Sequence, residues 1–266
     1  MDENKKVWVT VIVILLVIVL GGAVYYFVIL DRSKEAPEIP ELVEERPVES
    51  APREKKEDER DVVVPYDVPL DESDPLVRSS MKTVTSNPAL TSWLAASDLI
   101  RRFVAAVDNV ANGQSPRAHF DFFKLKRPFE VKSESGRDYI DPASFARYDA
   151  VAEAFVSLDT EKAVMLYRKL KPVIQDAYRE LGYPERDFQG TLEKAIRELL
   201  RVPVVKDILL QKKVVSYAMV EPRLENMSQA QKHLLRMGAE NVKKIQAKLR
   251  EMAEALGIPP TTLPSK

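Results

Sequence analysis

Residues 97–113 read SDLIRRFVAAVDNVANG, and this stretch decides the fold class. Its apolar side chains recur every three or four residues, which is the spacing of one face of an α-helix: Ile100, Phe103, Val104, Val107 and Ala111. Ser97 or Asp98 is a suitable N-cap, and Gly113 follows the last apolar position, where helices commonly end. The stretch predicts an amphipathic helix with one face in a core.

Helical periodicity continues on both sides of this stretch. The sequence predicts further helices over residues 74–84, 88–94, 141–158, 159–181, 191–201, 228–237 and 239–256. Strand patterns occur at 119–125, 129–131 and 138–140, with a turn at Ser135-Gly136 and a further strand edge at 208–215. The expected fold is α+β, a predominantly α-helical single domain with a small antiparallel β-hairpin.

The composition excludes several kinds of site. The 266 residues include no cysteine, two histidines and eight glycines. The chain therefore has no disulfide, no thiolate metal site and no cysteine nucleophile. Neither glycine-rich phosphate-binding motif occurs. We expect no cofactor, no metal and no catalytic residue that the sequence identifies.

Val7 to Leu30 form a run of 24 residues without a charge. As a helix the run reaches about 36 Å, enough for a hydrocarbon core of about 30 Å. It predicts a transmembrane helix after a short tail, residues 1–6, so the membrane is an expected partner. A cleavable signal peptide is the alternative, because Lys5 and Lys6 precede the run, but the run is long and ends on aromatic residues.

The orientation of this helix rests on its flanking charges. Lys5 and Lys6 flank one end of the run, and Arg32 and Lys34 flank the other. A short tail with a lysine pair ordinarily stays in the cytoplasm. We expect a single-pass protein of the bacterial inner membrane with its domain in the periplasm. A domain that faces the cytoplasm is the alternative.

The charge is divided unevenly along the chain. Residues 31–74 hold 7 basic and 16 acidic residues, six prolines and no glycine, which predicts a disordered acidic tether. An apolar patch at 62–66 is expected to dock on the domain or on a partner. Residues from 75 onward hold 31 basic and 23 acidic residues, so the folded domain, expected over 75–258 before a tail at 259–266, is basic.

Four stretches carry a family resemblance: WLAASDLIRRFV (93–104), ARYD (146–149), YRELGYP (178–184) and LLRMGAEN (234–241). They resemble, in order, the bacterial domain of unknown function family 3014, over nearly all of residues 70–256. The resemblance implies an N-terminal anchor, an acidic proline-rich linker and one domain. It implies no catalytic residue, since the family has no established activity. Ala239 stands where the resemblance leads us to expect proline.

Seven residues are candidates for binding: Arg101, Arg102, Arg147, Tyr148, Tyr183, Arg236 and Asn241. Arg101 and Arg102 flank an apolar helix stripe, and a forked guanidinium suits a carboxylate or phosphate. A surface ion pair is the ordinary alternative. Arg147 is expected to form an ion pair with Asp98 or with a neighbour of Asp149, while the Tyr148 side chain packs within the domain.

Arg236 lies before Gly238 at a predicted helix end, where a cation complements the helix dipole. An anion site shared by Arg236 and Asn241 is the functional interpretation. Tyr183 lies in a turn among charged and aromatic residues: Tyr178, Glu180, Glu185, Arg186 and Asp187. A pair of carboxylates there could serve a hydrolase of cell-wall polymer.

Basic clusters supply the remaining surfaces: 124–127, 168–171, 212–213 and 243–250. A solvated face is their ordinary explanation, and attraction to an anionic polymer or lipid is the functional one. We expect a binding or scaffolding module of the cell envelope whose partner is a protein or an anionic envelope polymer. Nucleic acid is not expected as a partner. An envelope hydrolase and a cytoplasm-facing regulatory module are the alternatives.

Overall fold

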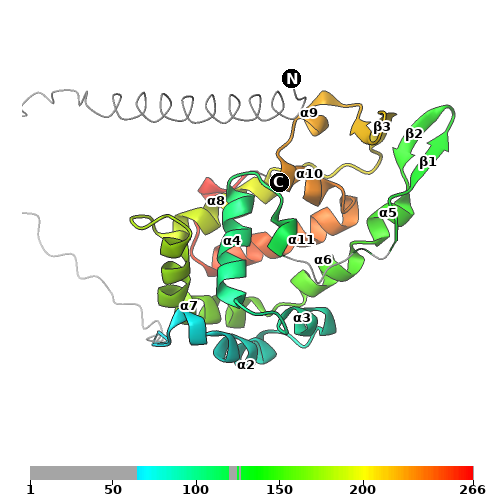
Figure 1. The fold of residues 1–266 in the computed structure, drawn as a ribbon. Coiled ribbons are helices and arrows are strands. Elements are labelled where there is room, and N and C mark those ends of the chain that lie inside the picture. The colour runs from blue at the N-terminus through cyan, green and yellow to red at the C-terminus, as the bar shows by residue number, and fades with distance from the viewer. Residues whose placement is uncertain (1–64, 120–124, 126, 266) are drawn as a thin grey trace, which may run out of the picture. The chain divides into compact units, whose positions relative to one another are not determined.

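The structure is a computed structural model that describes residues 65–119, 125 and 127–265 (Figure 1). The predicted transmembrane helix at 7–30 and most of the predicted tether lie outside the described residues. The described residues all belong to one compact unit, Glu59–Lys266. None of the helices within these ranges combines the length and the apolar character that a membrane crossing requires.

The described part of the chain is mostly helical, as the sequence predicts. Its α-helices are α2 (Asp74–Val84), α3 (Pro88–Trp93), α4 (Leu99–Ala111), α5 (Pro142–Ala146), α6 (Asp149–Val156), α7 (Thr160–Glu180), α8 (Phe188–Leu200), α9 (Pro222–Glu225), α10 (Gln229–Leu235) and α11 (Ala239–Ala255). Short 3-10 helices occur at η1 (Leu70–Glu72), η2 (Pro116–His119) and η3 (Pro260–Thr262).

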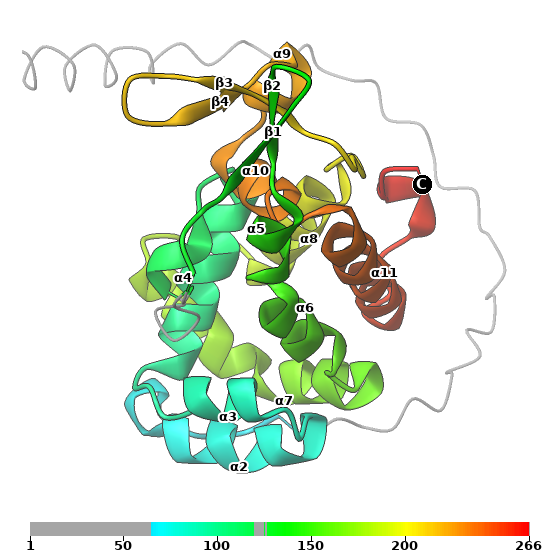
Figure 2. The same ribbon diagram turned by 90° about the vertical axis from the view of Figure 1, so that its right-hand side faces the viewer.

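Within the described residues, four short strands form one antiparallel sheet: β1 (Val131–Glu134), β2 (Arg137–Ile140), β3 (Leu209–Lys212) and β4 (Tyr217–Met219). The predicted hairpin is confirmed as β1 and β2, with its turn at Ser135 and Gly136, both of which have positive φ. The sheet is larger than predicted. A second hairpin, β3 and β4, pairs with the first through Asp138 and Leu210, so the two hairpins join in one sheet (Figure 2).

Two main clusters of buried side chains form the core. One lies among α2, α4 and α7 and includes Val104, Val173 and Tyr178. The other lies between the sheet and helices α6, α10 and α11 and includes Leu235 and Val242, both at most 1% exposed. Helix α8 joins the two clusters, since Leu192 packs against both. The sheet is thus fixed to the helices through one core and the N-terminal helices through the other.

Local capping explains where several helices begin. The side chain of Asp159 accepts a hydrogen bond from Lys162 N–H at the start of α7, and Asp141 caps α5 in the same way. Ser228 and Gln231 form a reciprocal capping box at α10. These predicted helix starts are confirmed.

Three predictions of helices and strands are wrong. The helix expected over 141–158 is two helices. The helical hydrogen bonding is interrupted because Tyr148 N–H donates to Phe145 O, only three residues back, and the Arg147 side chain donates to the carbonyl of Ser144. His119 lies in η2 rather than in a strand, while residues 120–124 of that predicted strand lie outside the described residues. Helix α8 begins at Phe188 rather than at Thr191, since Asp187 caps it.

The folded domain begins earlier than the predicted boundary at residue 75. Tyr66 N–H donates to Lys169 O at 2.9 Å, and the Lys169 ammonium lies 5.7 Å from the Tyr66 ring centroid. Val68 and Leu70 pack against the same core cluster. Tyr66, the last residue of the apolar patch predicted to dock, therefore lies against α7, while residues 62–64 of that patch lie outside the described residues. Residues 65–74 belong to the domain and not to the tether.

Candidate functional site

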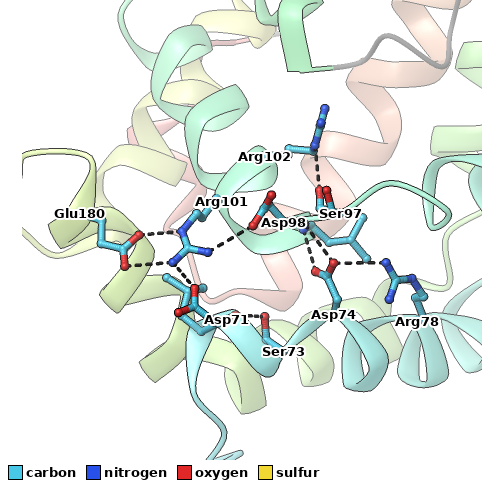
Figure 3. Close-up of polar contacts among 11 residues, drawn as sticks. Asp71, Ser73, Asp74, Arg78, Ser97, Asp98, Arg101, Arg102 and Glu180 are labelled. Carbon is cyan, nitrogen blue, oxygen red and sulfur yellow. Dashed lines mark hydrogen bonds and ion pairs between the residues drawn. The ribbon is translucent and has the colours of Figure 1, made fainter.

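Arg101 lies at the centre of an ion-pair network that we call the arginine cluster, formed with Asp71, Asp98 and Glu180 (Figure 3). Its Nε and Nη2 donate to the two carboxylate oxygens of Glu180 at 2.7 and 3.1 Å, and Nη2 also donates to Asp71 at 2.6 Å. These hydrogen bonds raise the pKa of Arg101 and lower that of Glu180. The guanidinium thus has partners within the domain, and it ties residues 65–74 to α4 and α7.

Arg102, next along α4, points away from the arginine cluster (Figure 3). Its Nε donates to the carbonyl of Ser97 at 2.9 Å, just before the helix begins. This bond holds the entry of the chain into α4. The two neighbouring arginines therefore do not converge on one anion.

Asp74 caps α4 from a distant part of the chain. Its carboxylate accepts from the backbone N–H groups of Asp98 and Leu99 at 3.0 and 2.9 Å, and from Arg78 at 3.2 Å. Asp98 itself makes no side-chain cap and has a φ of 58°. Sequence reasoning assigned Asp74 to the start of its own helix. The contact escaped prediction because its partners are 24 and 25 residues away.

Tyr183 lies against Tyr178, with ring centroids 4.7 Å apart, and the Arg186 guanidinium lies 5.3 Å from the centroid of the Tyr183 ring. Two of the nearby carboxylates also have partners, since Glu180 binds Arg101 and Asp187 caps α8, whereas Glu185 is exposed. A general acid requires a raised pKa, whereas the hydrogen bonds from Arg101 lower the pKa of Glu180. This geometry does not favour the acid–base pair that a hydrolase needs.

The basic cluster on α11 is not a free cationic face. Lys248 is buried, and its ammonium donates to Leu158 O at 2.9 Å and to Thr160 Oγ1 at 3.0 Å. Lys243 and Lys244 are exposed, and each pairs with a glutamate. Their charges are used within the domain.

A different surface is cationic and apolar at once. It is a groove of about 580 Å³ against the sheet, which we call the sheet-side groove. Its lining is mostly apolar: Phe129, Ile140, Leu210, Lys212, Lys213, Val214, Val215, Ser216, Tyr217, Met219 and Arg236. The rings of Phe129 and Tyr217 lie 6.1 Å apart between centroids. Among the residues that the structure describes, three cationic residues and no acidic one line the groove.

Arg236 is the predicted binding residue that lies in this groove. It occupies the C-cap of α10, as the sequence predicts, and is partly buried. Within the described residues its guanidinium forms no hydrogen bond or ion pair, although the charge of Arg236 contributes to lowering the pKa of Glu225. The main cause of that shift is the bond that Met219 N–H donates to Glu225. Arg236 therefore retains its donors for a ligand.

The family described as "Protein of unknown function (DUF3014)" matches residues 99–253. The chain belongs to the DUF3014 family. Comparison with curated proteins and with solved structures found no match. The matched range contains the whole sheet-side groove and Arg101 with Glu180, but not the partners Asp71 and Asp74.

Three other candidates, Arg147, Tyr148 and Asn241, serve the packing of the DUF3014 domain. The Arg147 guanidinium lies 5.7 Å from the Phe129 ring centroid and 5.5 Å from that of Tyr148, and it donates to the carbonyls of Ser144 and Arg127. The expected pairing of Arg147 with Asp98 is wrong, because Asp98 pairs with Arg101.

Asn241 is buried, and its amide donates to Asp149 Oδ1 and to Met237 O at 2.8 and 2.9 Å. Both amide hydrogens are therefore used within the domain. The anion site that the sequence predicts for Arg236 with Asn241 reduces to Arg236 alone. No group of side chains suited to holding a metal ion occurs among residues 65–119, 125 and 127–265.

We expect His233 to make the stability of the DUF3014 domain depend on pH. Burial, aided by the charges of Arg236 and Arg117, lowers the pKa of His233 below 6.5, and its Nδ1 lies 2.9 Å from Ser115 Oγ. The unfolded chain then binds more protons than the folded chain just below pH 6.5. We expect the free energy of unfolding to fall as the pH drops below 6.5, by at most about 1.4 kcal/mol per pH unit.

Urea unfolding at pH 7.5, 6.5 and 5.5 measures this slope, and the His233→Gln chain should lose most of it. The His119→Gln chain is the matched control. Carboxylates such as Glu225 and Glu251, whose pKa values are lowered, lose their contribution only below about pH 4.5. An unchanged slope in His233→Gln would show that another group causes it.

Proposed function

We propose that this protein is a membrane-anchored binding module of the bacterial cell envelope and that the sheet-side groove is its ligand site. The observation that best supports this proposal concerns Arg236, which has no hydrogen-bond or ion-pair partner among the described residues. The described residues around it in the groove are mostly apolar and include no acidic side chain. A ligand with an apolar body and an anionic group fits this lining.

The groove favours a protein segment over a polysaccharide as that ligand. Its volume of about 580 Å³ lies within the usual range for ligand sites, roughly 300–1,000 Å³. Ile140, Leu210 and Met219 form a floor that offers nothing to the hydroxyl groups of a sugar. An apolar segment that carries a carboxylate would bury side chains against this floor and place its charge at Arg236.

The anchor completes the proposal. The sequence predicts that residues 7–30 span the membrane, and we propose that residues 31–64 separate this span from the domain. If these 34 residues behave as a flexible coil, they reach about 30–35 Å r.m.s.. The domain then works close to the outer surface of the inner membrane. An envelope hydrolase is less favoured, since Glu180 is held by Arg101.

Photo-crosslinking from the groove tests the proposal in living cells. A photo-crosslinking amino acid replaces Tyr217 in the full chain, and the control carries it at Val204, an exposed valine in the loop between α8 and β3. We expect a discrete protein adduct from position 217 and none of the same mass from position 204. The same pattern of products from both positions would contradict a ligand in the groove.

A further inference from the structure

The turn of the β3–β4 hairpin exposes two apolar side chains. Val214 is 100% exposed and Val215 is 95% exposed, whereas every other exposed large apolar side chain in the described ranges is at most 47% exposed. Figure 2 shows the turn, which we call the hairpin tip (residues 212–216), extending away from the helices. Neither valine contributes to the core of this domain.

The hairpin tip is also basic. Lys212 and Lys213 precede the valines, and no acidic residue occurs between 209 and 219. The Lys213 ammonium donates to Gln211 at 2.7 Å, and neither lysine forms an ion pair within the described part of the chain. Lys213 N–H donates to Ser216 O at 2.8 Å, which closes the turn and fixes this arrangement. The tip thus presents an apolar end with cations beside it.

We propose that the hairpin tip contacts the surface of an anionic lipid bilayer, with Val214 and Val215 in the interfacial region and Lys212 and Lys213 at the headgroups. A turn of five residues is too small for a specific protein interface, which needs about 1,000 Å² of buried surface. A lipid surface accepts isolated apolar side chains and attracts lysines without such an area. The contact rests on the proposed anchor, which keeps the bilayer within reach.

The contact is weak by itself. A lysine near an anionic surface contributes about a fivefold factor in partitioning, and a buried valine roughly tenfold. The anchor makes the binding intramolecular, so that a weak contact suffices to orient the domain. The sheet-side groove, which the residues of the tip help to line, would then lie beside the membrane.

The full chain permits a clean test because it has no cysteine. Ser216→Cys places one thiol at the tip, and Glu185→Cys places one at an exposed turn elsewhere. Each chain carries a fluorophore and is reconstituted into vesicles that contain nitroxide-labelled lipid. One set of vesicles is neutral phosphatidylcholine, and the other contains one quarter phosphatidylglycerol.

We expect quenching at position 216 to be at least threefold stronger than at 185 in the anionic vesicles and to fall to the level of 185 in the neutral ones. Val214→Ser with Val215→Ser should reduce quenching at 216 by at least threefold, as should Lys212→Gln with Lys213→Gln. Val204→Ser with Val220→Ser is the matched control, since both valines are exposed but lie outside the tip.

Equal quenching at 216 and 185 in anionic vesicles would overturn the proposal. So would a label at 216 that becomes shielded in detergent as the protein concentration rises, because the tip would then bind a second copy of the chain. A chain that fails to float with the vesicles would overturn both the anchor and the tip contact. A chain that floats without quenching at 216 would overturn the tip contact alone.

Discussion

Gly238→Ala is expected to lower the free energy of unfolding by about 2–5 kcal/mol. This is the largest effect that we predict for the addition of one methyl group. Gly238 has a φ of 86° and a ψ of 158°, a backbone conformation that costs other residues about 1–3 kcal/mol. A Cβ there would also lie 2.6 Å from Cγ and 2.8 Å from Cβ of Phe145. Because Gly238 follows Arg236 by two residues, the strain would reach the sheet-side groove.

Two other glycines separate backbone strain from steric overlap. Gly182 has a φ of 107° but open space around it, so Gly182→Ala should show the strain alone. Gly190 lies within α8 with nothing near its Cβ position, and Gly190→Ala should stabilise the domain by up to about 1 kcal/mol. Urea unfolding of the full chain in detergent, followed by circular dichroism, measures all three. A Gly238→Ala chain as stable as Gly182→Ala would mean that Phe145 moves aside freely.

Asp74→Ala is expected to cost about 2–4 kcal/mol, because it removes the acceptor of two backbone N–H groups at the start of α4 and of Arg78. The side chain of Asp74 is only 17% exposed, so water replaces these bonds poorly. Asp74→Asn keeps one oxygen as an acceptor and should lose about half as much. Faster amide hydrogen exchange at Asp98 and Leu99 would accompany the loss.

Asp71→Ala is the matched control for this prediction. Asp71 also joins the N-terminal segment to α4, through Arg101, but its side chain is 82% exposed and Arg101 keeps Glu180. Its removal should therefore cost much less than that of Asp74. Equal effects of Asp71→Ala and Asp74→Ala would contradict the assignment of Asp74 as the cap of α4.

Local chemistry made much of the fold predictable. The caps of α5, α7 and α10 depend on residues within three positions of the helix start, and glycines mark the ends of α4 and α7. The joining of the two hairpins was not predictable in this way. It depends on pairing between Asp138 and Leu210, which are far apart in sequence. The capping of α4 by Asp74 was not predicted for the same reason, since Asp74 and Leu99 are also far apart in sequence.

The candidate site was predicted in part. Arg236 was identified as a cation at a helix end, but its apolar surroundings come from strands that the sequence showed only as an edge at 208–215. The signal for the hairpin tip was present, since two valines directly after two lysines are unusual in a turn. Arg101, Asn241 and Tyr183 were also candidates for binding, yet each has partners inside the domain. Residue type predicts capacity to bind, and only the fold shows whether that capacity is already used.

The dependence of the groove adduct on the charge at position 236 tests the central claim most directly. The yield of the crosslinked product from position 217 is measured in chains with Arg236, Arg236→Lys and Arg236→Glu, and in the control Arg201→Glu, whose side chain is 61% exposed at the end of α8. We predict that Arg236→Glu lowers the yield at least tenfold, that Arg236→Lys retains part of it and that Arg201→Glu leaves it unchanged. An equal yield from Arg236 and Arg236→Glu chains of equal stability would contradict the account.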